Sequence, residues 1–133
     1  MEPNGTKILI VDDDKFLLGM YSQKFLNKKF SVDIATGSLE ALKKLREGAM
    51  PDIMLLDVIM PNMDGIDLLK TIRDERLVPN ATIIMLTNEN QSSQIERAKA
   101  LNADGYIVKA SAIPSEVFDE VVKIYNTKKG RKA

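Results

Sequence analysis

The sequence predicts an α/β protein, a doubly wound parallel sheet of five strands alternating with five helices, (βα)₅. Short apolar runs recur along the chain, as expected for strands that are buried on both faces. Stretches with apolar residues at helical spacing separate these runs, and the alternation favours right-handed crossovers and parallel pairing. The chain has 133 residues, so the length indicates one domain, and five units are too few for an eight-stranded barrel.

The first unit is a strand at 7–11, formed by Ile8-Leu9-Ile10-Val11, and a helix at 14–28. Asp14 is expected to cap this helix, because a carboxylate accepts hydrogen bonds from the first free amides. The helix is expected to turn three apolar residues toward the sheet, namely Phe16, Met20 and, as a further candidate, Phe25.

The second unit is a strand at 31–35, where apolar and polar residues alternate, and a helix at 38–47. Ser38 is a candidate N-cap, and Gly48 is suited to end the helix. The expected inward residues are Leu39, Leu42 and Leu45.

The remaining units follow the same pattern, with a Pro61–Gly65 loop before the third helix. Their strands are expected at 52–57, 82–87 and 105–109. Their helices are expected at 65–75, 92–101 and 115–127. The domain is therefore placed at 7–127, and the basic residues of 128–133 are interpreted as a flexible tail.

Four of the predicted strands deliver polar residues at the point where they end. Asp12-Asp13-Asp14 follow the first strand, and Asp57, Thr87 and Lys109 end the third, fourth and fifth. Because the carboxyl ends of parallel strands meet at one edge of the sheet, these side chains are expected to form one site.

Three carboxylates brought together repel one another unless a cation joins them, and Mg²⁺ prefers oxygen ligands and keeps waters that a phosphate can replace. The charges of Asp12, Asp13 and Asp57 are balanced formally by Mg²⁺ and Lys109. Such a site suits phosphoryl transfer, in which Lys109 and the metal neutralise phosphoryl oxygens and the Thr87 hydroxyl donates a hydrogen bond. The chain has neither Cys nor His, so the nucleophile must be a carboxylate, and Asp57 is the best placed.

The amino-acid composition excludes several other classes of function. The 19 basic and 19 acidic residues cancel, which argues against a broad nucleic-acid surface. Neither a signal peptide nor an apolar run of membrane-spanning length is seen, so a cytoplasmic protein without membrane contact is expected. Because there is no His, any phosphohistidine must belong to another protein.

The chain resembles the receiver domain of two-component response regulators from about Lys7 to Tyr125. The resemblance rests on the joint order and spacing of Val11-Asp12-Asp13, Leu55-Leu56-Asp57, Met60-Pro61, Asp64-Gly65, Leu86-Thr87 and Tyr106-Ile107-Val108-Lys109. It implies a flavodoxin-like fold with strand order 2-1-3-4-5. It also implies a signalling switch within a phosphorelay rather than an enzyme.

The resemblance further implies roles for individual residues. Asp57 would accept a phosphoryl group from a histidine kinase or a histidine phosphotransfer protein. Mg²⁺, with Mn²⁺ as a substitute, would be held by Asp12, Asp13, Asp57 and the backbone carbonyl of Ile59. Thr87 and Tyr106 would act as a switch pair. The face made by 92–101, 105–109 and 115–127 would then bind a downstream protein or dimerise.

Three positions, Ala110, Asn88 and Ile59, depart from the family pattern. Ala110 follows Lys109 where the family usually has a proline after a cis peptide, and a cis bond before Ala costs about 2.5–4 kcal/mol. Asn88 replaces a typically small residue and is expected to narrow access to the phosphoryl group. Ile59 and Glu89 flank the path of the hydrolytic water, and bulky Ile59 is expected to slow dephosphorylation.

Two alternatives accompany this interpretation. One is a Mg²⁺-dependent phosphatase of the haloacid dehalogenase type, in which Asp12 rather than Asp57 would be phosphorylated. The other is a receiver fragment of a larger hybrid kinase or transcription regulator. A degenerate receiver that acts only as a scaffold is disfavoured, because all five key residues, Asp12, Asp13, Asp57, Thr87 and Lys109, are present.

Overall fold

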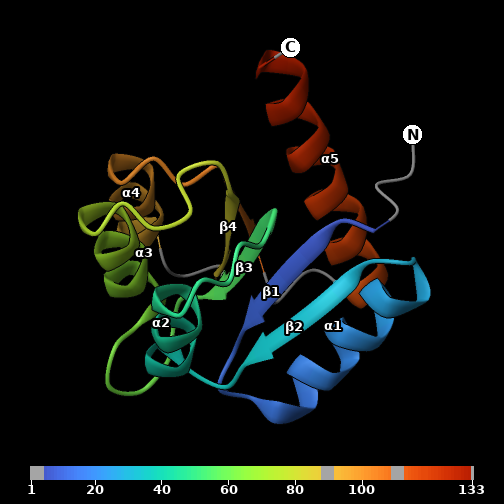
Figure 1. The fold of residues 1–133 in the computed structure, drawn as a ribbon, viewed down its shortest axis with the longest axis horizontal. Helices are drawn as coiled ribbons and strands as arrows, with labels where there is room; N and C mark the ends of the chain where they lie inside the picture. The colour runs from blue at the N-terminus through green and yellow to red at the C-terminus, as the bar shows by residue number, and fades with distance from the viewer. Residues whose placement is uncertain (1–4, 88–91, 109–112, 133) are drawn as a thin grey trace.

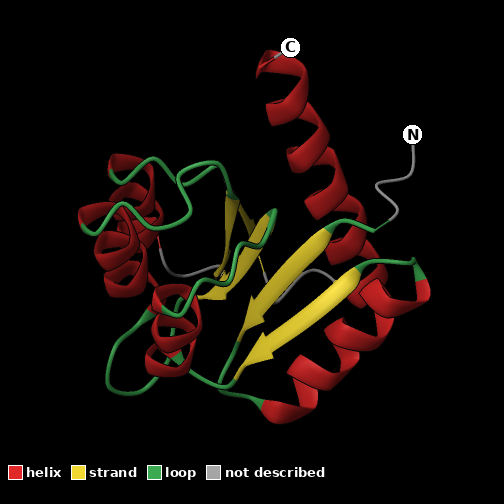
Figure 2. Ribbon diagram, viewed as in Figure 1, coloured by secondary structure: helices red, strands yellow, loops and turns green. Residues whose placement is uncertain are grey.

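The computed structural model describes residues 5–87, 92–108 and 113–132. Its five parallel strands form one sheet in the order β2-β1-β3-β4-β5. Helices cover both faces of the sheet (Figures 1 and 2). The predicted fold class and strand order are therefore confirmed.

The observed elements agree with the predicted ones within one or two residues, except at the end of the last helix. In chain order they are β1 (Lys7–Val11), α1 (Lys15–Asn27), β2 (Ser31–Ala35), α2 (Ser38–Arg46), β3 (Ile53–Asp57), α3 (Gly65–Asp74), β4 (Thr82–Thr87), α4 (Ser92–Ala100), β5 (Gly105–Val108) and α5 (Pro114–Lys132).

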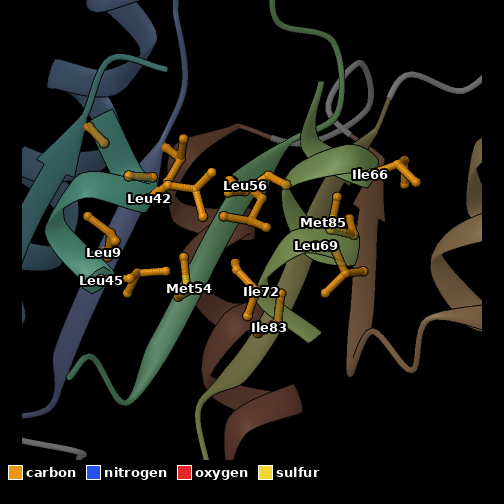
Figure 3. Close-up of a cluster of buried hydrophobic side chains, with 14 of the residues drawn as sticks. Leu9, Leu42, Leu45, Met54, Leu56, Ile66, Leu69, Ile72, Ile83 and Met85 are labelled. Carbon is orange, nitrogen blue, oxygen red and sulfur yellow. The ribbon is translucent and has the colours of Figure 1, made fainter. Parts of the chain in front are cut away.

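Each face of the sheet has its own apolar core, because side chains along a strand alternate between faces. On β3, Met54 and Leu56 join the cluster that α2, α3 and α4 cover, which Figure 3 shows. Ile53 and Leu55 join the opposite cluster, with α1 and α5. Each fully buried side chain of this kind contributes about 1.5–3 kcal/mol, so the sheet is a rigid base for residues at its carboxyl edge.

The prediction for the buried face of α1 was wrong in part. Leu18, Tyr21 and Phe25 are buried, whereas Phe16 is 74% exposed and Met20 is also exposed. The observed stripe follows spacings of three and four residues. Phe16 and Met20 each lie two positions from Leu18, which is about 200° around a helix and hence on the opposite side.

The start of α2 also differs from the prediction. Ser38 is the first helical residue and Gly37 is the N-cap. Thr36 instead donates its backbone N–H to the Glu40 carboxylate, 2.6 Å away. Leu39 is exposed, whereas the buried stripe consists of Ser38, Ala41, Leu42 and Leu45. Gly48 adopts φ +108° after the helix, as predicted for a terminating glycine.

The last helix continues to Lys132, five residues beyond the predicted end at 127. Lys128, which was expected in a tail, is anchored to the sheet. Its Nζ donates to the Ala81 carbonyl at 2.8 Å and lies 3.1 Å from the Asp104 carboxylate. The same carboxylate accepts the backbone N–H of Ile83. Charge patterning alone therefore placed Lys128 wrongly, because its long side chain reaches a polar group at the start of β4.

Within the described residues, no helix combines the length and apolar character needed to cross a membrane.

Candidate functional site

An acidic cluster lies where β1 and β3 end side by side. Val11 of β1 pairs with Leu56 of β3, so the residues that follow them, Asp12 and Asp57, are neighbours. Carboxylate oxygens of Asp12, Asp13 and Asp57 lie within 4.8 Å of one another. Asp12 and Asp57 are buried and Asp13 is exposed. The cluster therefore has a buried floor and one side open to solvent.

Asp14 does not belong to this cluster. Its carboxylate caps α1 by accepting the backbone N–H groups of Phe16 and Leu17 at 3.0 and 3.1 Å. The Asp14 amide in turn donates to Asp12 Oδ1 at 2.9 Å. Two of the three consecutive aspartates thus face the site, and the third starts the helix, as predicted from its cap chemistry.

The backbone of Asp57 is held by the start of α3. The Gly65 amide donates to the Val58 carbonyl at 2.8 Å. A Cβ at Gly65 would lie 2.2 Å from the backbone oxygen of Asp57, which is closer than any tolerated contact. Gly65 belongs to the Asp64-Gly65 motif of the sequence, but the motif alone does not predict this contact. Its position directly after the helix cap Asp64 was the only available signal.

Thr87 and Tyr106 share one face of the sheet. Met85 pairs with Tyr106 and Thr87 pairs with Val108, so Thr87 and Tyr106 are diagonal neighbours. The Thr87 hydroxyl is buried and has no hydrogen-bond partner among the described residues. Tyr106 is partly buried against the cluster beneath α4. An unpartnered buried hydroxyl at a strand end is costly unless a ligand engages it.

Ile59 is 47% exposed, two residues after Asp57. Its side chain is therefore at the surface beside the acidic cluster. The other predicted residues, Lys109, Asn88 and Glu89, lie outside the described residues, as does Ala110.

The three carboxylates are a donor set suited to a hard divalent cation. Mg²⁺ is usually held by few carboxylates and retains waters, and the exposed side at Asp13 leaves room for such waters. A cation would also relieve the repulsion among the three aspartates.

Comparison with known proteins gives one consistent family. A family model described as the response regulator receiver domain matches residues 8–121. The chain is 35% identical to the chemotaxis protein CheY of Thermotoga maritima, over 90% of this chain and 98% of that protein. It is 37% identical to the transcriptional regulatory protein ResD of Bacillus subtilis over 87% of this chain, but spans only 46% of ResD.

Solved structures agree with these relatives. A CheY-like receiver domain protein of Methanospirillum hungatei superposes with a TM-score of 0.85 at 26% identity, covering 96% of this chain and 99% of that one. The chemotaxis protein CheY4 of Vibrio cholerae gives a TM-score of 0.81 at 29% identity, covering 90% and 98%.

Proposed function

Because the chain belongs to the response regulator receiver domain family of two-component systems, we propose that Asp57 is its phosphoacceptor. The observation that carries the proposal is the cluster of Asp12, Asp13 and Asp57 within 4.8 Å, at the switch point where the chain leaves β1 for one side of the sheet and β3 for the other. Receivers are signalling proteins and are not generally classed as enzymes.

In the proposed reaction, a carboxylate oxygen of Asp57 bonds to phosphorus as the phosphorus–nitrogen bond of a donor phosphohistidine breaks. Asp12 and Asp13 help Asp57 to hold Mg²⁺, which would offset the negative charge of the phosphoryl oxygens. Lys109, at the end of the fifth strand in sequence, would supply the second positive charge. The rigid strands β1 and β3 keep the carboxylates in place, so little reorganisation is needed.

The proposed switch begins at Thr87. Its buried hydroxyl, which has no partner within the part of the chain that the structure describes, would donate to a phosphoryl oxygen, and Tyr106, its diagonal neighbour, would repack in response. The added charge of about −1.5 to −2 thereby shifts the population of the α4–β5–α5 face between two packings. That face is the proposed contact with a downstream protein or a second copy.

The test is labelling with acetyl phosphate and Mg²⁺, followed by intact-mass and peptide mass spectrometry. We expect one phosphoryl adduct on Asp57, lost in Asp57→Asn, and strongly reduced when Mg²⁺ is chelated. A phosphatase of the haloacid dehalogenase type would instead be labelled on Asp12. Labelling that persists in Asp57→Asn and disappears in Asp12→Asn would therefore overturn the proposal.

The donor and target are accessible to direct assay. We propose a sensor histidine kinase or a histidine phosphotransfer protein as the donor, since this chain has no His. Phosphotransfer profiling against the histidine kinases of the host, with Asp57→Asn as the control, would identify it. The chain spans less than half of ResD. In a second form of the proposal, this receiver is therefore one domain of a regulator that also has an output domain.

A further inference from the structure

Lys99, on the last turn of α4, contacts the side chain of Tyr106 on β5. Its Nζ lies 5.5 Å from the centre of the tyrosine ring, within the range of cation–π attraction. The pKa of Lys99 is raised, chiefly by its interaction with the Tyr106 side chain and further by the charge of Glu96. The Glu96 carboxylate, on the same helix, lies 3.8 Å from the same ammonium, so Glu96 supports Lys99 within α4 while Tyr106 is its partner on β5.

We propose that Lys99 is a latch that holds Tyr106 in the packing seen here, in which the Thr87 hydroxyl has no partner from residues 5–87, 92–108 or 113–132. This inference rests on the proposed function, because it assigns a control to the Thr87–Tyr106 switch. Tyr106 is only partly buried, so apolar packing does not by itself fix the ring. A cation over the ring adds an orientation-dependent attraction, which is lost when the ring turns away from α4.

The latch opposes the proposed activation. A repacking of Tyr106 that carries its ring away from α4 would break the contact with Lys99. The latch therefore lowers the population of the alternative packing before phosphorylation. Exposed cation–π contacts change such an equilibrium by roughly two- to fivefold, and the Lys99 side chain is 55% exposed. We expect an effect of that size.

The experiment follows Tyr106 directly by ¹⁹F NMR of the full chain labelled with 3-fluorotyrosine. The chain has three tyrosines, and Tyr106→Phe identifies the Tyr106 signal by its loss. Beryllofluoride with Mg²⁺ serves as the phosphoryl mimic. In Lys99→Met, the signal without beryllofluoride should move toward its beryllofluoride-bound position. The beryllofluoride concentration for half of the change should fall roughly two- to fivefold.

Two variants serve as controls. Lys99→Arg keeps a cation and should behave as the wild type does, and Lys123→Met removes an exposed lysine of α5 and should have no effect. If the wild type responds but Lys99→Met matches it, or if Lys99→Arg matches Lys99→Met, the latch is wrong while the proposed function stands. If the wild-type Tyr106 signal ignores beryllofluoride, the Thr87–Tyr106 switch and the latch are both contradicted, whereas the phosphoacceptor role of Asp57 is decided separately by the labelling experiment.

Discussion

Gly65 and Asp57 are coupled by a contact that leaves no room for a side chain. The Cβ of an alanine at 65 would lie 2.2 Å from the Asp57 backbone oxygen and 3.0 Å from Val58 Cα. Gly65→Ala must therefore displace either α3 or the end of β3. We expect a loss of about 1–3 kcal/mol in the free energy of unfolding, as for other overpacked sites, and slower acetyl phosphate labelling of Asp57.

Gly19→Ala is the matched control, since nothing lies within 4 Å of its added Cβ on α1. That change should stabilise the protein by roughly 0.5–1 kcal/mol through helix propensity and leave labelling unchanged. Urea unfolding and the initial labelling rate of folded protein separate the two effects. A folded Gly65→Ala variant that is labelled at the wild-type rate would show that the contact does not position Asp57.

Ile59 is exposed beside the acidic cluster, where its bulk can hinder an attacking water. Ile59→Asn should shorten the half-life of phosphorylated Asp57, by an order of magnitude at most, since a polar side chain both opens the path and orders water. Phosphate release after removal of the donor measures this rate. Ile59→Leu keeps the bulk and should leave the half-life close to that of wild type, and an unchanged half-life in Ile59→Asn would contradict the hypothesis.

The sequence predicts the positions of those site residues that depend only on the order of the strands. Asp12, Asp13 and Asp57 could be placed together because each follows a buried run, and parallel strands end at a common edge. Gly65 and Lys99 could not be assigned, because their roles depend on distances between elements far apart in the chain. The spacing of residues along a sequence does not indicate the distance between two elements in the folded protein.

At the scale of elements, Arg73 of α3 caps the end of α4. Its Nε donates to the Leu101 carbonyl at 3.1 Å and its Nη2 to the Asn102 carbonyl at 2.8 Å. These carbonyls lie where a helix leaves acceptors without intrahelical partners, and a cation there also complements the helix dipole. Arg73→Met should cost about 1–2 kcal/mol of unfolding free energy and speed hydrogen exchange at the end of α4.

Arg97→Met, on α4 itself, provides the comparison for Arg73→Met on α3. Arg97 pairs with Asp67 at 3.6 Å, and both side chains are about half exposed, so its loss should cost less than about 1 kcal/mol. Equal costs for the two variants would mean that Arg73 acts as an ordinary surface charge.

The pairing of α2 with α3 gives a pH-dependent contribution to stability. Arg46 Nε donates to Glu75 Oε1 at 3.0 Å, and this hydrogen bond chiefly lowers the pKa of Glu75 below its ordinary value of 4.5. A carboxylate with a lowered folded pKa stabilises the protein above its unfolded pKa and loses this effect as the pH falls through the folded pKa. Glu75→Gln should therefore lower Tm slightly at pH 7, and the difference should shrink below the ordinary carboxyl pKa and vanish once the pH lies below the lowered folded pKa.

Arg46→Met tests the source of that pH dependence. In this background, adding Glu75→Gln should change Tm much less at pH 7, and the change should be nearly independent of pH. Added salt should also reduce the effect of Glu75→Gln when Arg46 is present, because both side chains are exposed. An effect of Glu75→Gln that persists at low pH would contradict the assignment to this ion pair.

Whole elements were predictable where the periodicity was unbroken, and less so where helices carry apolar residues on both sides. The strands, the helices and their order followed from buried runs and turns. On α1, the exposed Phe16 and Met20 suggest a different buried face from the one that Leu18, Tyr21 and Phe25 form. Only the packing of the helix against the sheet determines which face is buried. On α5 the helix continues to Lys132 and Lys128 pairs with Asp104, a contact between distant parts of the chain that charge patterning does not contain.

For the molecule as a whole, the acidic cluster that serves the proposed function lowers the stability of the fold. Three carboxylates within 4.8 Å repel one another in the folded state more than in the unfolded chain. Asp13, the exposed member, can be neutralised without leaving a buried charge behind. Asp13→Asn should therefore raise the unfolding free energy in the presence of a chelator by about 1 kcal/mol, as for other sites that favour function over stability.

In the presence of Mg²⁺, the wild type should instead be more stable than Asp13→Asn. A ligand that binds only the folded state adds about 2.7 kcal/mol at one hundred times its Kd, so wild-type Tm should rise steeply with Mg²⁺ while Asp13→Asn responds weakly. Asp119→Asn, at an exposed position on α5, changes the net charge equally and should respond as the wild type does. Thermal unfolding of the three proteins, with chelator and across a Mg²⁺ titration, measures both effects. If Asp13→Asn is less stable than the wild type in chelator, then Asp13 stabilises the fold through attractive contacts. In that case the three carboxylates do not destabilise the folded state by repelling one another.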